Sequence, residues 1–209
     1  MSLARDAHPR RPPDDERRAN ILEAAERAFV RYGFHAATMT QVAEEAGMSA
    51  GNLYRYFPSK EAIVEGLCEA DQVERSEAFA ALASAQDLKA AMRAALQQQV
   101  LGCPPAKARL ILEIWAESGR NERVAAFARQ LDSDVIEGLV ELVQLAKARG
   151  VAAPALDARF AASLLFTLVS GLFRRKALEP NFELVAESAV VLSVLEALFA
   201  GALGARAEV

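Results

Sequence analysis

The chain has 209 residues, of which 53% are hydrophobic and 25% are charged, and its formal net charge is −4. This composition excludes general disorder, and the negative balance excludes a polycationic protein that binds nucleic acid over its whole surface. The length allows one or two domains, and one compact unit with a small appendage is the simplest division. Residues 1–60 carry a net charge of +1 and residues 61–209 carry −5, so any nucleic-acid binding must be local.

Two features of the sequence concern the compartment of the protein. The longest uncharged run in the C-terminal half, residues 160–173, has 14 residues and falls short of the roughly 18 to 20 needed to cross a bilayer. No apolar stretch follows the basic N-terminus, which argues against a secretory signal. We therefore expect a cytoplasmic protein without a membrane partner.

The cysteines and histidines do not have the spacing of a metal site. Cys68 and Cys103 lie far apart, and the only histidines are His8 and His35, which excludes the familiar zinc patterns. We expect no metal, no cofactor and no catalytic residue. Cys103 precedes two prolines at a predicted helix start, where the helix dipole lowers the pKa of a thiol. Cys103 is therefore either a redox sensor or a buried or bystander thiol, and we favour the second interpretation.

The N-terminal segment changes character near residue 14. Residues 1–13 are rich in arginine and proline without hydrophobic periodicity, which predicts a flexible arm. This arm either touches DNA or is a disordered leader, because nearby acidic residues nearly cancel its arginines. From about Asp15 to Tyr32 apolar residues recur at spacings of three and four, which predicts a helix that stops at Gly33.

A short second helix is predicted from its two ends. Thr38 and Gln41 form a T-x-x-Q capping box, in which both side chains satisfy amide donors at the start of a helix over Met39–Ala46. Gly47 ends this helix, because a residue without a Cβ atom readily adopts the left-handed conformation of a sharp reversal.

Ser49 caps a third helix over about Ala50–Tyr56, which Pro58 cannot continue, and Ser59 caps the next. The rest of the chain predicts long helices separated by Gly, Pro and Asn, without β-alternation. They cover about residues 60–84, 87–101, 105–118, 121–148, 157–178 and 182–200. The expected fold is all-α, with about nine helices.

The two short helices are joined through Gly47, Met48 and Ser49 and form a helix–turn–helix. The run from Thr38 to Glu61 resembles the signature region of the TetR family of bacterial transcriptional regulators. The resemblance rests on Thr38, Thr40, Val42, Ala43, Ala46, Gly47, Ser49 and the ending Leu53-Tyr54-x-Tyr56-Phe57-x-Ser59-Lys60. Together with the first helix it covers roughly a quarter of the chain, and the body matches the family only in helical content and length.

We therefore expect three segments: the flexible arm over 1–13, a helix–turn–helix DNA-binding domain over 14–60, and a ligand-binding and dimerisation domain over 61–209. The resemblance implies the roles of individual residues in the DNA-binding domain. It assigns the DNA-facing side of the third helix to Ala50, Gly51, Asn52, Tyr54, Arg55 and Tyr56. It places Thr38, Thr40, Tyr54 and Lys60 near the phosphate backbone, and we add Gln41 and Ser49 at the two helix starts. Arg55 suits a guanine edge or a phosphate, and Asn52 suits an adenine.

Some residues of this region have a competing role in the core. An aromatic residue at the end of so small a domain usually fills its core, which applies to Tyr56 and Phe57. We assign Phe57 to the core, with four further residues: Leu53, Val42, Phe29 and Ala25.

The last two predicted helices are apolar all round, so they need cover on more than one side. We expect a two-fold, four-helix interface between two copies of the chain, in preference to a thick monomeric core. Small residues that permit close approach there are Ser170, Gly171, Ala189, Ser193 and Ala197. Two-fold symmetry predicts a near-palindromic double-stranded DNA operator.

An apolar effector pocket is expected between the fifth and eighth helices. Its predicted lining is Met92, Leu96, Gln99, Ile111, Leu112, Trp115, Phe127, Leu131 and Phe166. Such a lining suits a hydrophobic small molecule, with Trp115 as a stacking wall, although core packing is the simpler role for each residue taken alone.

The sequence leaves three functions open. The first is a repressor that a small ligand releases from DNA, and repression is implied by the resemblance alone. The second keeps the DNA-binding head and gives the body a protein partner. The third is a helical enzyme with carboxylate chemistry. The sequence argues against it, because it contains no nucleophile–base pair, no metal cluster and no glycine-rich phosphate loop.

Overall fold

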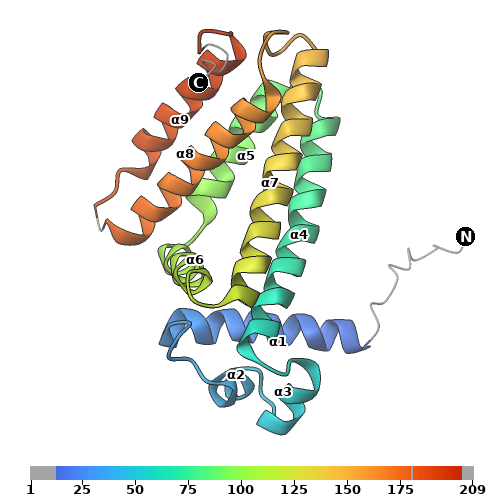
Figure 1. Cartoon of the computed structure of the whole chain (residues 1–209), viewed down its shortest axis with the longest axis vertical. Helices are drawn as coiled ribbons and strands as arrows, with labels where there is room; N and C mark the ends of the chain where they lie inside the picture. Colours follow the sequence, from blue (N-terminus) through green and yellow to red (C-terminus); the bar gives the residue numbers. More distant parts are fainter. Residues whose placement is uncertain (1–12, 180, 204–209) are drawn as a thin grey trace, which may run out of the picture. The chain divides into compact units, whose positions relative to one another are not determined.

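The computed structural model of the chain describes residues 13–179 and 181–203. Within these ranges the secondary structure is helical (Figure 1), and each predicted helix is present within two residues of its expected bounds. The helices are α1 Pro13–Tyr32, α2 Met39–Glu45, α3 Ala50–Tyr56, α4 Lys60–Ser84, α5 Leu88–Gly102, α6 Pro105–Ser118, α7 Glu122–Ala148, α8 Ala158–Leu178 and α9 Leu184–Phe199. The predicted arm lies outside the described residues except for Pro13, which begins α1.

The chain forms two compact units, and the division falls within α4, between Leu67 and Cys68. We call them the head and the body. The first two turns of α4 belong to the head because their backbone packs there: a Cβ atom at Gly66 would lie 2.9 Å from Phe57 Cε1 and 3.0 Å from Leu22 Cδ2. The described residues contain no helix with the length and apolar character of a membrane span.

The core of the head is built from α1, α2 and α3. The predicted core residues are confirmed: Ala25, Phe29, Val42, Leu53 and Phe57 are each at most 1% exposed. Phe34 adds an edge-to-face contact with Phe29, with ring centroids 5.2 Å apart. Such a small core needs the buried Ile63 and Val64 of α4 as well.

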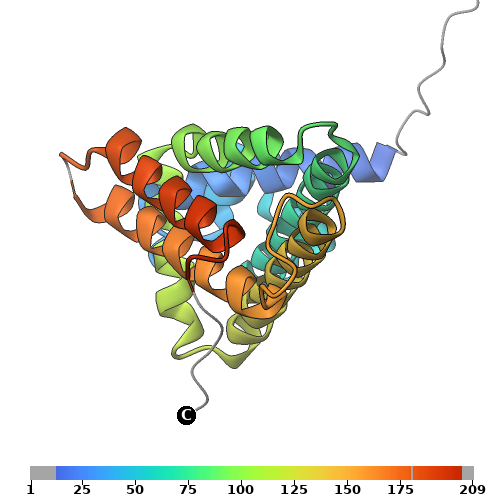
Figure 2. The same ribbon diagram turned by 90° about the horizontal axis from the view of Figure 1, so that it is seen from above.

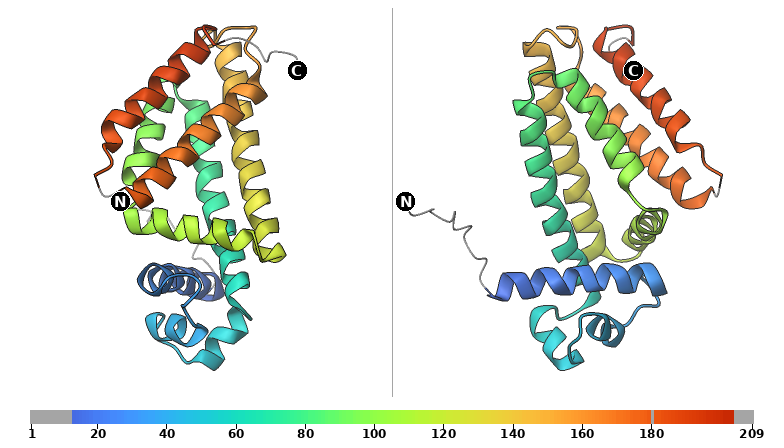
Figure 3. Two further views of the ribbon diagram at one scale, coloured as in Figure 1. Left: turned by 60° about the vertical axis from the view of Figure 1, so that its left-hand side comes forward. Right: turned by 180° about the vertical axis from the view of Figure 1, so that it is seen from behind.

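In the body, α7 packs against α6 and α8, α8 against α9, and α5 against α9. Figures 2 and 3 show α8 and α9 along one side of the body and α4 beside α7 along another. The main core cluster draws residues from α5, α7, α8 and α9, among them Leu88, Val143, Leu165, Leu195 and Leu198. A smaller cluster joins Leu172 of α8 and Val191 of α9. The helices therefore enclose their own core on one side and leave other faces of α8 and α9 outside it.

Candidate functional site

Local hydrogen bonds fix the turn between α2 and α3. The Thr38 backbone N–H donates to Gln41 Oε1 at 2.9 Å, and the Gln41 N–H donates to Thr38 Oγ1 at 3.2 Å, which completes the predicted capping box. At the other end of α2, Gly47 has a φ of +65°, and the Met48 N–H donates to the Ala43 carbonyl at 2.9 Å. Ser49 Oγ then accepts the Asn52 N–H at 3.3 Å and caps α3.

The side chains of α3 alternate between the core of the head and its outer surface. Leu53 is buried, whereas Tyr54 is 51% exposed and Arg55 is exposed as well. Arg55 makes no hydrogen bond or ion pair with any residue that the structure describes, so its guanidinium is available to an outside partner. Of the other predicted DNA-facing residues, Gly51 is exposed and Ala50, Asn52 and Tyr56 are half-buried.

Several residues predicted to lie near the phosphate backbone also have local partners. Lys60 Nζ donates to the Phe34 carbonyl at 2.8 Å and to the His35 carbonyl at 2.9 Å, which occupies two of its three N–H donors. The side chains of Thr38, Gln41 and Ser49 serve the helix caps, while Thr40 is exposed. The sequence pattern did not reveal the contact of Lys60 with the turn between α1 and α2, because it joins residues 26 and 25 positions apart.

The structure does not bring the nine predicted effector residues together. Trp115 and Phe166 line one cavity of about 480 Å³, with Ser118, Gly119, Ala125, Ala128, Arg129, Asp132 and Ser170. The others lie elsewhere. Met92 belongs to the main core cluster, Leu96 packs on the Leu172–Val191 cluster, Gln99 is exposed, and Ile111, Leu112, Phe127 and Leu131 are half-buried outside this cavity.

Asp132, which was not among the predicted site residues, also lines the Trp115 cavity. Asp132 is half-buried, and burial raises the pKa of its carboxyl group above the ordinary value. No described residue forms a hydrogen bond or ion pair with it. The wall of this cavity is therefore less apolar than predicted.

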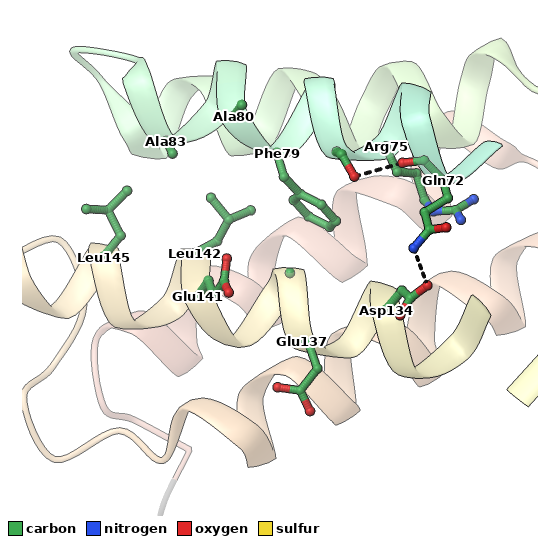
Figure 4. A pocket seen from close by; sticks show the side chains of 12 residues that line it. Gln72, Arg75, Phe79, Ala80, Ala83, Asp134, Glu137, Glu141, Leu142 and Leu145 are labelled. Carbon is green, nitrogen blue, oxygen red and sulfur yellow. Dashed lines mark hydrogen bonds between the residues drawn. The ribbon is translucent and has the colours of Figure 1, made fainter. Parts of the chain in front are cut away.

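A second and larger hollow of about 550 Å³ lies between α4 and α7. Figure 4 shows the two helices with the side chains that line it. The lining residues are Gln72, Arg75, Ser76, Phe79, Ala80, Ala83, Asp134, Glu137, Gly138, Glu141, Leu142 and Leu145. We call it the α4–α7 groove. It shares no residue with the predicted pocket, and the only hint of it in the sequence is a glycine, Gly138, inside a long helical pattern.

Comparison with known proteins decides the family. The model of the bacterial regulatory proteins of the tetR family matches residues 21–67, and the model described as "BetI-type transcriptional repressor, C-terminal" matches residues 84–200. The chain belongs to the TetR family. This TetR-family protein is a DNA-binding transcriptional regulator and not an enzyme, and the family binds operator DNA and small-molecule effectors.

Individual relatives match over most of the chain. The regulator UidR of Escherichia coli K12 is 28% identical over 157 residues, 74% of this TetR-family chain and 78% of UidR. The regulator TtgR of Pseudomonas putida is 29% identical over 186 residues, 79% of this chain and 82% of TtgR. Among solved structures, Salmonella enterica GusR superposes with a TM-score of 0.75 at 28% identity, over 90% of this chain and 97% of GusR.

Proposed function

We propose that the protein is a homodimeric repressor that leaves a near-palindromic operator when a hydrophobic small molecule binds its body. The observation that carries the DNA-reading part is Arg55, which is exposed on the capped helix α3 and has no hydrogen bond or ion pair with a described residue. An arginine in this position has the donors to contact a guanine edge bidentately. The description of the matched C-terminal family as a repressor supports repression over activation.

The proposed DNA surface separates residues that read sequence from residues that position the head. Arg55, Asn52 and Tyr54 would address bases or the phosphates beside them, while Ala50, Gly51 and Tyr56 would allow close approach. Thr38, Thr40, Gln41, Ser49 and Lys60 would lie along the phosphate backbone, with the amides of two helix starts. Specificity would then depend on few side chains.

Dimerisation is proposed through α8 and α9, the last two helices. Large apolar side chains remain on their outer surface: Leu178 is 57% exposed, Val185 70% and Val190 59%. Gly171, Ala189 and Ser193 are exposed small residues on the same two helices, and small residues permit close helix packing. A two-fold dimer would place two heads on equivalent half-sites, which is the basis of the near-palindromic operator.

Two cavities in the body, of about 480 and 550 Å³, have the volume of small-molecule sites. This supports an effector over a protein partner as the signal that the body receives. A body that binds a protein partner is the alternative, and release of DNA by a compound separates the two.

The test is binding of the purified protein to the DNA that flanks its own gene, measured by fluorescence anisotropy across a salt titration. We expect selective, salt-sensitive binding that a hydrophobic compound reverses. Arg55→Ala is expected to weaken selective binding by about ten-fold or more. Arg120→Ala, which removes the same charge from an exposed position of the body, should leave it unchanged.

Each failure of this test has its own meaning. Unchanged binding by a folded Arg55→Ala dimer would refute the assignment of α3 residues to the DNA surface. Selective binding that no compound alters would favour the protein partner. Failure to select any sequence from genomic DNA would refute the repressor itself.

A further inference from the structure

The buried ring of Phe57 ends α3 inside the head. Phe57 is fully buried and is the C-cap of α3, and its backbone N–H donates to the Leu53 carbonyl at 2.9 Å. Arg55, two residues before it, lies on the outer surface beside Tyr54. Because α3 has only seven residues, the packing of Leu53 and Phe57 sets the orientation of this outer surface.

Residues of α1 and α4 surround the Phe57 ring, and one of them is charged. The Arg18 guanidinium of α1 lies over the ring, with its carbon atom 4.4 Å from the ring centroid. A Cβ atom at Gly66 of α4 would be 2.9 Å from Phe57 Cε1, 3.0 Å from Leu22 Cδ2 and 3.4 Å from Arg18 Nη2. The glycine therefore lets the backbone of α4 approach both the ring and the guanidinium.

A guanidinium has properties that suit this place. Its flat face stacks on an aromatic ring, and the attraction between the cation and the ring is stronger where both are shielded from water. Arg18 is half-buried and the ring is fully buried, so water screens this contact less than it would on the surface. The contact thus adds a directional attraction between α1 and the end of α3 to the apolar packing of the core.

We propose that Arg18 is a positioning residue for operator binding. Its stack on Phe57 holds the end of α3 in the orientation that presents Tyr54 and Arg55 to DNA. Side chains of a binding site must be held to within about 0.5 Å of their productive position, and a shift of that size at one end of a seven-residue helix is enough to misplace Arg55. The inference rests on the proposed assignment of α3 to the DNA surface.

The experiment is a double-mutant cycle on DNA affinity, measured by fluorescence anisotropy with the full-length protein. The two probes are the duplex that the protein selects from genomic DNA and a random duplex of the same length. We expect Arg18→Met to weaken binding of the selected duplex by about five-fold or more, because it keeps the apolar stem and removes the stack. In an Arg55→Ala background the same change should weaken it by at most about two-fold, because the side chain that it positions is absent.

The matched control is Arg17→Met, which removes the same charge from the adjacent residue. Arg17 is exposed and has no hydrogen bond or ion pair with a described residue. It should leave the affinity for the selected duplex unchanged, and the two variants should bind the random duplex equally. Circular dichroism at the temperature of the binding measurement checks that each variant is folded.

A second variant moves the ring while every charge is retained. The methyl group of Gly66→Ala overlaps Phe57 Cε1, so the ring must shift within the core. Binding of the selected duplex should weaken by about three-fold or more, although the Arg18 side chain is intact. This variant separates the position of the Phe57 ring from the charge of the head.

The alternatives give different results. Equal losses from Arg17→Met and Arg18→Met, an equal loss from Arg18→Met with and without Arg55, or unchanged binding by folded Gly66→Ala would each overturn the proposal. A salt slope that Arg18→Met lowers by about 1 in the Arg55→Ala background would overturn it too, since Arg18 would then contact a phosphate directly. If Arg55→Ala weakens binding and Arg18→Met does not, this inference alone fails. If Arg55→Ala has no effect, the assignment of α3 to the DNA surface fails and this inference fails with it.

Discussion

The ring of Phe79 on α4 lies directly on the backbone of α7 at Gly138. A Cβ atom at Gly138 would be 2.4 Å from Phe79 Cε2 and 2.7 Å from Phe79 Cδ2, closer than carbon atoms approach without displacement. The absence of a side chain at residue 138 therefore lets α4 and α7 hold the ring between them. On one side of this contact, Gln72 joins Asp134, and beyond the other side Arg149 donates to the Ala83 and Ala85 carbonyls at 2.7 Å each.

The first prediction concerns Gly138→Ala. The added methyl group forces the Phe79 ring to move, and overpacking of this kind costs about 1–3 kcal/mol. The gain in helix propensity from glycine to alanine offsets about 1 kcal/mol of it. We expect a net loss of about 1 kcal/mol in the free energy of unfolding of the body, measured by urea denaturation.

The control for this prediction is the same substitution without the ring. In a Phe79→Ala background the overlap is absent, and Gly138→Ala should stabilise the body by about 1 kcal/mol. The sign of the effect thus reverses between the two backgrounds, as a double-mutant cycle measures. The same sign in both would show that the contact does not hold α4 against α7.

The helices were predictable because their ends are decided by neighbouring residues. Thr38 and Gln41 are three positions apart and form hydrogen bonds with each other, and Gly47 adopts a positive φ in the turn that ends α2. Side-chain caps and left-handed glycines depend only on residues that are close together in the sequence, so a local sequence pattern reveals them. The alternation of Leu53 and Phe57 with the exposed Tyr54 follows from the same helix period.

The cavities were not predictable by the same reasoning. The expected pocket gathered apolar residues, yet an apolar residue fills space well: Met92 is 6% exposed within the main core. The larger groove is lined at one end by polar side chains and exists between α4 and α7, whose facing residues lie about 60 positions apart. Helical periodicity indicates which face is buried, but it does not indicate which distant helix leaves room beside it.

The second prediction separates two roles of Lys60. Lys60→Met removes the donor to the Phe34 and His35 carbonyls, so the head should lose about 1–2 kcal/mol, seen as faster hydrogen exchange in α2 and α3. If its third N–H meets a phosphate, the salt slope of operator binding should fall by about 1. Lys89→Met, an exposed change on α5, should affect neither measurement. An unchanged slope would remove Lys60 from the DNA surface, and unchanged exchange would refute the structural role.

The third prediction uses the pH dependence of Asp132. Burial raises the pKa of this carboxyl above its ordinary value of 3.8, so the folded protein binds the proton more tightly than the unfolded chain does. The resulting stability is present below the ordinary value and is lost as pH rises through the folded pKa. Asp132→Asn should therefore be more stable than the wild type at neutral pH, and the gap should close in acid. A gap that stays constant between acidic and neutral pH, by thermal unfolding, would contradict a raised pKa.

The last prediction places a charge in the proposed dimer interface. Val190 of α9 is 59% exposed and Val73 of α4 is 56% exposed, so either residue accepts a glutamate in the isolated chain at little cost. In a two-fold interface through α8 and α9, Val190→Glu buries a carboxylate from each copy without a partner, at a cost of at least about 3 kcal/mol. The dimer dissociation constant should rise by about 100-fold or more in light scattering, and operator binding should fail because two heads are no longer held together.

The control is Val73→Glu, which lies on a helix outside the proposed interface, and this variant should remain dimeric. Dissociation by Val73→Glu but not by Val190→Glu would place the interface on another face of the body.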